Sequence, residues 1–446
     1  MGMDIRTTVT AAEGTPRELE ARRFSPWEPG FRNERELLCV YEDALCQEVE
    51  GFGGAVTAAT AAVFDALSAA EQEQLLTAYF HPQKGLAYNM CRTHVGSCDF
   101  SSGNYSHDDT PEDFELAHYR PDVDSAAAAI ICRASQEAKD LRLIASPWSP
   151  PGWMKSNGTM SNGGVLRKEC YESWARYLAR YVTEYRRAGV NLWALTVQNE
   201  PDAVQPWESC IFTGQDERQF AEGWLAPALK HAGAGDTKLL FWDYNKSGVV
   251  ERAASVFEGR RPGSGAGAFH GMAFHWYTGD HFEALDIVRE RYPGLKLYAT
   301  EACEETLARV DERTLAEHYA HDIIGDLNHG ASAWLDWNIL LDADGGPNHA
   351  GNYCYAPVQL RDGRVEYGLP FHYIGHFSRF VRRGARRVGF SRYTDRFECT
   401  VLENPDGTCV VIALNRRDAP ERFVLKCRHG KADFTIPARG IMTICY

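Results

Sequence analysis

The chain has 446 residues and a formal net charge of −14, from 47 Lys and Arg against 61 Asp and Glu. With 44% apolar and 24% charged residues it has the composition of a folded globular protein, which excludes disorder as its main state. The negative charge argues against nucleic acid as a partner. No run approaches the roughly 20 apolar residues of a membrane-spanning helix. The polar start of the chain favours a cytoplasmic location, with leaderless export left open.

The 13 cysteines are scattered, with no CxxC pair and no Cys/His run at zinc spacing. We therefore expect neither a metal site nor a disulfide framework. Positive charge collects at the end of the chain, where residues 377–446 carry 14 basic and 7 acidic residues. A solvated arginine-rich face is the simpler interpretation of this segment, and weak contact with an anionic membrane surface is the alternative.

Eight apolar segments rich in β-branched or aromatic residues follow one another along the chain. They begin near Gly51, Ala87, Leu141, Leu192, Leu239, Met272, Leu295 and Ala331. Successive starts are about 23 to 54 residues apart, which leaves room for a crossover helix each time, as parallel strands require. The pattern predicts an α/β protein with a (β/α)₈ TIM barrel over residues 51–378.

Helical periodicity fills the gaps between these segments and changes after the eighth one. Helices are predicted at residues 58–67, 70–80, 125–139 and 171–188. Short strands are predicted at residues 397–402, 409–414 and 422–427, and also at 36–41 and 44–49 near the start. We therefore expect residues 1–50 to join residues 379–446 in an attached antiparallel β-sandwich.

Polar side chains follow the predicted barrel strands, at the end where barrel enzymes carry their working residues. Glu200 follows the fourth predicted strand and Glu301 ends the seventh, with Trp, Tyr and Asn residues nearby. Aromatic faces and hydrogen-bonding groups suit a sugar, and two carboxylates that flank a glycosidic bond supply acid/base catalysis and a nucleophile. The pattern predicts a glycosidase. For either glutamate by itself, a salt bridge or a solvated loop position is the alternative.

Three further features are given a structural interpretation. Residues 51–54 (GFGG) lack the Lys and Ser/Thr of a phosphate loop, so we expect a tight turn at the first strand. His275 has no second histidine at ligand spacing on its strand, so we expect a hydrogen-bonding wall residue. Cys98 and Cys303 have no evident paired histidine, which favours buried small apolar residues over nucleophiles.

At these positions the sequence resembles glycoside hydrolase family 30, particularly bacterial members of its glucosylceramidase branch. The matching motifs run in order from about Gly51 to Gly389. They are GFGG at 51–54, SCDFS at 97–101, ASPWSPP at 145–151, NEP at 199–201, FHWY at 274–277, TEAC at 300–303, DWN at 336–338, GGPN at 345–348 and GHFS at 375–378. The set is specific, whereas NEP alone is shared with many barrel glycosidases.

The resemblance implies a retaining β-glycosidase with a (β/α)₈ barrel and a β-sandwich built from both chain ends. It makes Glu200 the general acid/base and Glu301 the nucleophile. By the same resemblance the first-subsite sugar is contacted by Asp99, Trp148, Asn199 and Trp337, with Asn352 near that subsite. The carboxylates would be oriented by Arg92, His275 and Tyr277.

The expected substrate is a β-glucoside or a glycolipid, cleaved by double displacement without a metal or organic cofactor. Two other substrate classes of the same family stay open, namely β-xylosides and β-1,6-glucans. A non-catalytic carbohydrate-binding barrel is the alternative from another class of protein, and the presence of both carboxylates argues against it.

Overall fold

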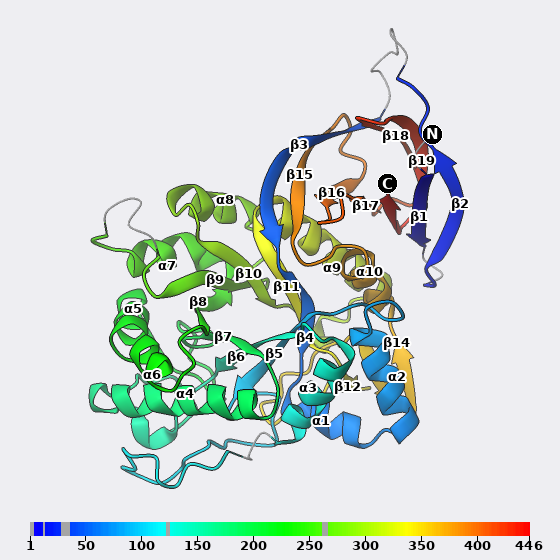
Figure 1. Cartoon of the computed structure of the whole chain (residues 1–446). Coiled ribbons are helices and arrows are strands. Elements are labelled where there is room, and N and C mark those ends of the chain that lie inside the picture. The colour runs from blue at the N-terminus through cyan, green and yellow to red at the C-terminus, as the bar shows by residue number, and fades with distance from the viewer. Residues whose placement is uncertain (1–3, 12–13, 28–35, 122–124, 261–265) are drawn as a thin grey trace. The chain divides into compact units, whose positions relative to one another are not determined.

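The structure, a computed structural model, describes residues 4–11, 14–27, 36–121, 125–260 and 266–446. Eight parallel strands close into a barrel in the order β10-β11-β4-β5-β6-β7-β8-β9 (Figure 1). Their bounds are β4 Gly51–Ala55, β5 Met90–Val95, β6 Arg142–Pro147, β7 Leu192–Thr196, β8 Lys238–Asn245, β9 Phe269–His275, β10 Lys296–Glu301 and β11 Ala331–Asn338. The predicted barrel is confirmed. The second strand begins later than predicted because Ala87 has a left-handed backbone, with φ 56°, which a strand cannot contain.

Helices connect the barrel strands and follow the last one. They are α1 Ala58–Asp65, α2 Ala69–Phe80, α3 Ser125–Glu137, α4 Tyr171–Arg187, α5 Gly214–Phe220, α6 Ala226–His231, α7 Val249–Val256, α8 Phe282–Arg291, α9 Glu312–Asn328 and α10 Leu369–Ser378. Ser68 starts α2 with a capping box to Glu71, and Thr57 caps α1. Short 3₁₀ turns lie at Gly152–Met154, Lys168–Cys170, Lys246–Gly248 and Thr306–Ala308, and a π turn at Ala221–Leu225 joins α5 to α6. No described helix has the length and apolar character needed to cross a membrane.

The glycine-rich run at residues 51–54 belongs to β4 itself, so the expectation of a tight turn there is wrong. A Cβ on Gly53 would lie 2.1 Å from the Met90 carbonyl oxygen, and one on Gly54 would lie 2.6 Å from Ile339 Cγ2. Glycine is required because neighbouring strands approach too closely for any side chain.

A second sheet of nine strands is built from both ends of the chain, in the order β19-β18-β3-β15-β16-β17-β20-β1-β2. Its strands are β1 Asp4–Thr10, β2 Arg17–Arg23, β3 Leu37–Val49, β15 Ala385–Arg392, β16 Glu398–Glu403, β17 Cys409–Asn415, β18 Glu421–Cys427, β19 Gly430–Ile436 and β20 Gly440–Cys445. Neighbouring strands are antiparallel except β3 and β18, which are parallel. This confirms the predicted β domain from both termini. A small sheet contains β12 Leu341–Asp342, β13 Val358–Arg361 and β14 Arg364–Tyr367.

The two strands predicted near the start of the chain are one long strand, β3, interrupted by a bulge. Along β15, Val388 pairs with Leu45 and the next residue, Gly389, pairs with Tyr41, so three residues of β3 have no partner. Gly389 faces this bulge, where a Cβ would lie 2.8 Å from the Cβ of Ala44. The bulge separates the two alternating patterns that the sequence contains.

The chain divides into two compact units. One contains Met1–Phe52, Arg309–Ala333 and Glu366–Tyr446, and the other contains Gly53–Ala308 and Trp334–Val365. This grouping places α9 and α10 with the nine-stranded sheet, and the predicted boundaries at residues 50 and 378 stay predictions.

Several arginines of the basic segment 377–446 pair with acids of their own unit, among them Arg382 with Asp406, Arg396 with Glu36, Arg416 with Glu398 and Arg439 with Glu317. These pairs favour the solvated, neutralised face over a membrane-binding one.

Candidate active site

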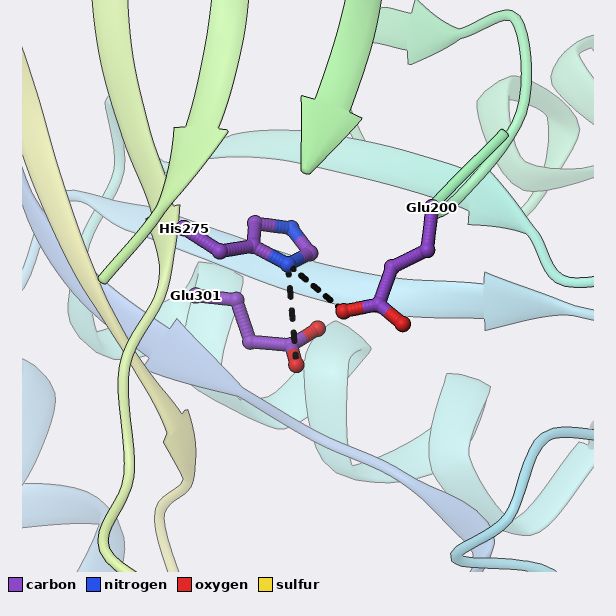
Figure 2. Close-up of side chains that lie close together, drawn as sticks. All are labelled: Glu200, His275 and Glu301. Atoms are coloured by element: carbon purple, nitrogen blue, oxygen red, sulfur yellow. Dashed lines mark hydrogen bonds and ion pairs between the residues drawn. The ribbon is translucent and has the colours of Figure 1, made fainter. Parts of the chain in front are cut away.

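The candidate site is formed by side chains at the carboxyl ends of the barrel strands. His275 and Glu301 are the last residues of β9 and β10, Arg92 lies in β5, and Glu200 follows β7. Figure 2 shows the imidazole of His275 and the carboxylates of Glu200 and Glu301 turned toward one another. The structure therefore brings together the two glutamates that the sequence singled out.

Glu301 is held by a donor on each of its two carboxylate oxygens. The Tyr277 hydroxyl donates to Oε1 at 2.8 Å, and Arg92 Nη1 donates to Oε2. The side chain is only 8% exposed, so these donors replace most of the hydration that the carboxylate loses. The two donors fix the Glu301 side chain in one orientation.

Asp243, in the middle of a buried network, was not among the predicted site residues. Arg92 Nη2 donates to Asp243 Oδ2 at 2.9 Å, and the Ser146 and Thr300 hydroxyls donate to Asp243 at 2.8 and 2.7 Å. Burial alone would raise the pKa of Asp243, but the positive charges of Arg92 and His275 outweigh it and lower this pKa. Its position at the end of the fifth predicted strand was the available signal. A buried Asp on a strand offers no other pattern by which sequence could identify it.

His275 lies between carboxylates on both sides of its ring. Nδ1 is 3.2 Å from Glu200 Oε1 and 4.0 Å from Glu301 Oε1, and Nε2 is 3.2 Å from Asp243 Oδ1. Burial would lower the pKa of His275, but the surrounding carboxylates, Glu301 foremost, raise it to about 9. At neutral pH the ring is therefore an imidazolium that donates on both sides. This places it in the hydrogen-bonding role predicted from sequence.

Among the residues that the structure describes, Glu200, His275 and Glu301 form the group whose donor atoms are close enough for a metal ion, all within 4.8 Å of one another. An imidazolium has no lone pair to offer a metal, because both ring nitrogens carry protons. A metal ion at this group would therefore have to displace the proton of His275 Nδ1.

Glu200 occupies a strained backbone position. Its φ of 48° is left-handed, which costs a non-glycine residue free energy on the order of 1–3 kcal/mol. The turn is held by hydrogen bonds from the Glu200 amide to the Asp243 carbonyl and from the Ala203 amide to the Glu200 carbonyl. Burial raises the pKa of Glu200, His275 opposes this shift, and the Glu301 charge adds to it. A carboxyl group in this setting retains its proton to higher pH than a solvated glutamate.

The strand that faces Glu200 is also distorted. Trp242 and Asp243 in β8 have φ of 75° and 52°, and the register to β9 shifts between Trp242 and Tyr244. The Trp242 amide donates to Glu217 Oε1 at 3.0 Å, and Glu217 accepts a further hydrogen bond from Arg252. Bulges of this kind re-aim side chains beside functional sites. Here the bulge directs Asp243 toward Arg92 and His275.

An aromatic platform lies beside the carboxylates. The rings of Trp148 and Trp337 stack with centroids 5.3 Å apart and planes 24° apart. The Arg92 guanidinium lies 4.9 Å from the first ring and 5.3 Å from the second. Cys98 and Cys303 are buried in the cluster that contains these rings, in agreement with the apolar role predicted for them. Asn199, another predicted residue, accepts a hydrogen bond from Arg92 Nη2 at 2.8 Å.

Asp99 and Asn352 form the other side of the site. Asn352 Nδ2 donates to Asp99 Oδ2 at 3.0 Å, whereas Asp99 Oδ1 is buried and has no hydrogen-bond partner among the described residues. Burial raises the pKa of Asp99 well above its usual range, and the charges of Glu301, Glu208 and Glu200 add to this. Eight of the ten predicted site residues are thus joined by contacts around Arg92, Glu301 and His275, and Asp99 and Asn352 form a hydrogen-bonded pair.

Two family models match consecutive parts of the chain. The glycosyl hydrolase family 30 TIM-barrel domain matches residues 49–381, and the glycosyl hydrolase family 30 beta sandwich domain matches residues 384–444. The chain belongs to glycosyl hydrolase family 30. As a family 30 member it is a glycoside hydrolase, which confirms the enzyme class and the family predicted from sequence.

Among known proteins similar to this family 30 enzyme, two are named after different substrates. Lysosomal acid glucosylceramidase of Mus musculus is 33% identical over 404 residues, covering 85% of this chain and 77% of that one. The crystal structure of SrfJ from Salmonella typhimurium is 35% identical with a TM-score of 0.93, covering 100% of this chain and 99% of that one. Endo-1,6-beta-D-glucanase of Neurospora crassa is 26% identical over 434 residues, covering 88% of this chain and 86% of that one.

Proposed function

We propose that this enzyme is a retaining β-glucosidase of the glucosylceramidase type, with Glu301 as nucleophile and Glu200 as acid/base. The observation that carries the proposal is the separation of the two carboxylates, whose facing oxygens lie within 4.8 Å. Retaining glycosidases keep their carboxyl groups about 5–5.5 Å apart, and inverting enzymes about 6.5–9.5 Å apart to admit a water molecule. The similarity to mouse lysosomal acid glucosylceramidase supports the choice of a glucoside.

In the first step a Glu301 oxygen attacks the anomeric carbon while Glu200 donates its proton to the glycosidic oxygen. The bond to the leaving group breaks, and a glycosyl ester on Glu301 forms. Burial of Glu200 favours the protonated form that this step requires. Tyr277 and Arg92 hold the Glu301 carboxylate in position for the attack.

In the second step water attacks the anomeric carbon of the ester, and Glu200 accepts the proton of that water. The bond to Glu301 breaks and restores the carboxylate. His275 stays between the two glutamates and compensates whichever of them carries the negative charge. Because Asp243 contacts both Arg92 and His275, it fixes the two cations relative to each other.

The test is hydrolysis of an aryl β-glucoside and of glucosylceramide, with the configuration of the released sugar followed by NMR. The expected first product is the β-anomer. Incubation with an activated 2-deoxy-2-fluoroglucoside is expected to leave a covalent adduct on the peptide that contains Glu301. Release of the α-anomer, or an adduct on another residue, would contradict the proposed roles.

A second candidate activity is hydrolysis of β-1,6-glucans, because a relative with that name aligns with 88% of this chain. The carboxylate roles would be unchanged and only the substrate would differ. Cleavage of a β-1,6-linked glucan at a higher rate than the aryl glucoside or glucosylceramide would favour it. A higher rate on an aryl β-xyloside would favour a β-xylosidase.

We further propose a reducing, cytoplasmic setting, since all 13 cysteines are free thiols. Alkylation of the protein purified from its native cells, denatured but not reduced, is expected to label 13 thiols. A smaller number, or recovery of the protein in the culture medium, would contradict this location.

A further inference from the structure

Glu208, in the loop that follows Glu200, is a buried carboxylate that the catalytic proposal does not use. The residue is 1% exposed, and its side chain is fully buried. Neither carboxylate oxygen accepts a hydrogen bond from any residue that the structure describes. Buried acceptors without donors are rare in folded proteins, and each one asks for an explanation.

His349 lies close to the Glu208 carboxyl group but does not form a hydrogen bond with it. Its Nε2 lies 3.4 Å from Glu208 Oε2, within ion-pair distance, but neither atom has a hydrogen bond of acceptable geometry. Its Nδ1 lies 3.0 Å from the Ser101 carbonyl oxygen, which can only accept, so Nδ1 carries a proton. His349 is therefore held in place by Ser101, and the Glu208 oxygens remain without a hydrogen-bond donor among the described residues.

Lys155 supplies the nearby positive charge that makes a buried Glu208 tolerable. Lys155 is 2% exposed, and its ammonium donates to the Met160 and Ser209 carbonyls, so it fixes the backbone beside Glu208 without donating to the carboxylate. Burial lowers the pKa of Lys155 to about 8, and electrostatic interactions with Cys210 and Glu208 oppose this shift. The loop thus contains a buried carboxyl group whose two oxygens have no hydrogen-bond donor among the described residues.

Glu208 is connected to the Asp99 side of the site through His349. The His349 amide donates to the Asp99 carbonyl at 3.3 Å, and the His349 ring lies 3.4 Å from Glu208 Oε2. The hydrogen bonds of Glu200 and Glu301 lead instead to His275, Arg92 and Tyr277. Asp99 Oδ1 is a further buried acceptor without a partner among the described residues.

We infer that Glu208 is a specificity residue that accepts a hydrogen bond from the C4 or C6 hydroxyl of the sugar in the first subsite. The inference rests on the proposed β-glucosidase function and extends it to the end of the sugar remote from the anomeric carbon. Sugar hydroxyls are the donors that the free oxygens of Glu208 and Asp99 lack. A site built to bind a hydroxyl discriminates strongly against substrates without it, because its own polar groups are then left unpaired.

The test is kcat/KM for 4-nitrophenyl β-glucoside and its 2-, 4- and 6-deoxy analogues, measured with the full chain and Glu208→Gln. We expect the substitution to lower kcat/KM for the glucoside about 10- to 100-fold. On either the 4-deoxy or the 6-deoxy substrate the loss should fall below about threefold, because the bond is already missing there. It should persist on the 2-deoxy substrate, whose missing hydroxyl is next to the anomeric carbon.

The matched control is Glu290→Gln, since Glu290 is an exposed glutamate of α8, and its kinetics are expected to be unchanged. An equal loss on all four substrates, or no loss with any of them, would overturn the inference by indicating a structural or negligible role. Glu208→Asp keeps the charge but withdraws the oxygens, and it should show the same substrate pattern. If Glu208→Gln does not fold, Glu208→Asp takes its place in the test.

Failure of the proposed function is recognised separately, as wild-type inactivity on the glucoside itself. In that case calorimetry with the imino sugar deoxynojirimycin, and with its analogues lacking the corresponding hydroxyls, tests Glu208 directly. Weaker binding of the parent compound by Glu208→Gln, with unchanged binding of one analogue, supports the inference. Equal binding of the parent by both proteins, or no binding by wild type, overturns it.

Discussion

The two compact units of this protein place their charges in opposite ways. At the barrel mouth, Arg92, Asp243 and His275 are fully buried and connected to one another. In the nine-stranded sheet the core is apolar, and ion pairs such as Arg382 with Asp406 lie at the surface. Buried charges are expensive to desolvate, whereas surface pairs contribute little. The difference indicates that the barrel mouth is arranged for chemistry and the sheet for stability.

The largest effect is expected for the proposed nucleophile. Glu301→Gln should lower kcat on an aryl β-glucoside by about four orders of magnitude, because the amide cannot form the glycosyl ester. Its circular dichroism spectrum should match that of wild type. Substantial residual turnover, after contamination is excluded by a second purification, would remove Glu301 from the mechanism.

The buried network should affect activity and stability together. Asp243→Asn removes one of the two carboxylates that Arg92 and His275 share, so we expect kcat to fall about 100-fold or more and the free energy of unfolding to fall by about 3–5 kcal/mol. Urea unfolding and steady-state kinetics measure the two changes. A variant that loses stability but retains full kcat would contradict the conclusion that the buried charges of the barrel mouth serve the chemistry.

The proposed proton donor predicts a pH dependence. Glu200 must be protonated for the first step, and burial raises its pKa, so kcat/KM should fall as the pH rises through that value, about tenfold per pH unit above it. Glu200→Gln should abolish this limb of the profile. With a substrate whose leaving group needs no proton, azide is expected to restore turnover. An unchanged alkaline limb in the variant would assign the titration to another group.

The core of the nine-stranded sheet should affect stability alone. Ile444→Ala removes a fully buried side chain, and we expect it to lower the free energy of unfolding by about 2–5 kcal/mol. The kcat of the folded fraction should stay within twofold of wild type. A large loss of kcat under conditions where the variant is fully folded would show that the sheet influences the chemistry.

The smallest effect is expected at the surface of the sheet. Arg382→Ala breaks the pair with Asp406, in which both side chains are about half or more exposed, so the change in unfolding free energy should stay below about 1 kcal/mol. Repeating the urea titration at 1 M salt should leave the wild-type stability almost unchanged. A loss comparable to that of Ile444→Ala would contradict the contrast between buried and surface charge.

The barrel could be predicted from sequence because each parallel strand is a buried apolar run, separated from the next by a helix-length gap. Glu200 and Glu301 could be predicted as site residues because the apolar runs show that both lie at the ends of barrel strands. Asp243 and Glu208 were not singled out, because their importance depends on which atoms they meet. For Glu208 the decisive property is the lack of a donor, which only a three-dimensional arrangement reveals.

The bulge in β3 and the strands β1, β2, β15, β19 and β20 were also missed. β1 and β2 consist mostly of polar and charged residues, with the sequences DIRTTVT and RELEARR, and give little apolar signal. Their pairing depends on residues from the opposite end of the chain, at sequence separations over which local patterns carry no information. Long-range pairing of this kind overrides local propensity.

The pairing of β1 with β20 brings the two ends of the described chain to the same place, where Arg6 is opposite Cys445. β20 lies between β17 and β1, so it is an interior strand of the sheet. A circularly permuted protein, in which a short linker joins these ends and the chain opens at the exposed Asp362–Gly363 turn between β13 and β14, should retain every strand pair of the sheet. Removal of β20, by contrast, would expose the hydrogen-bonding edges of both of its neighbours.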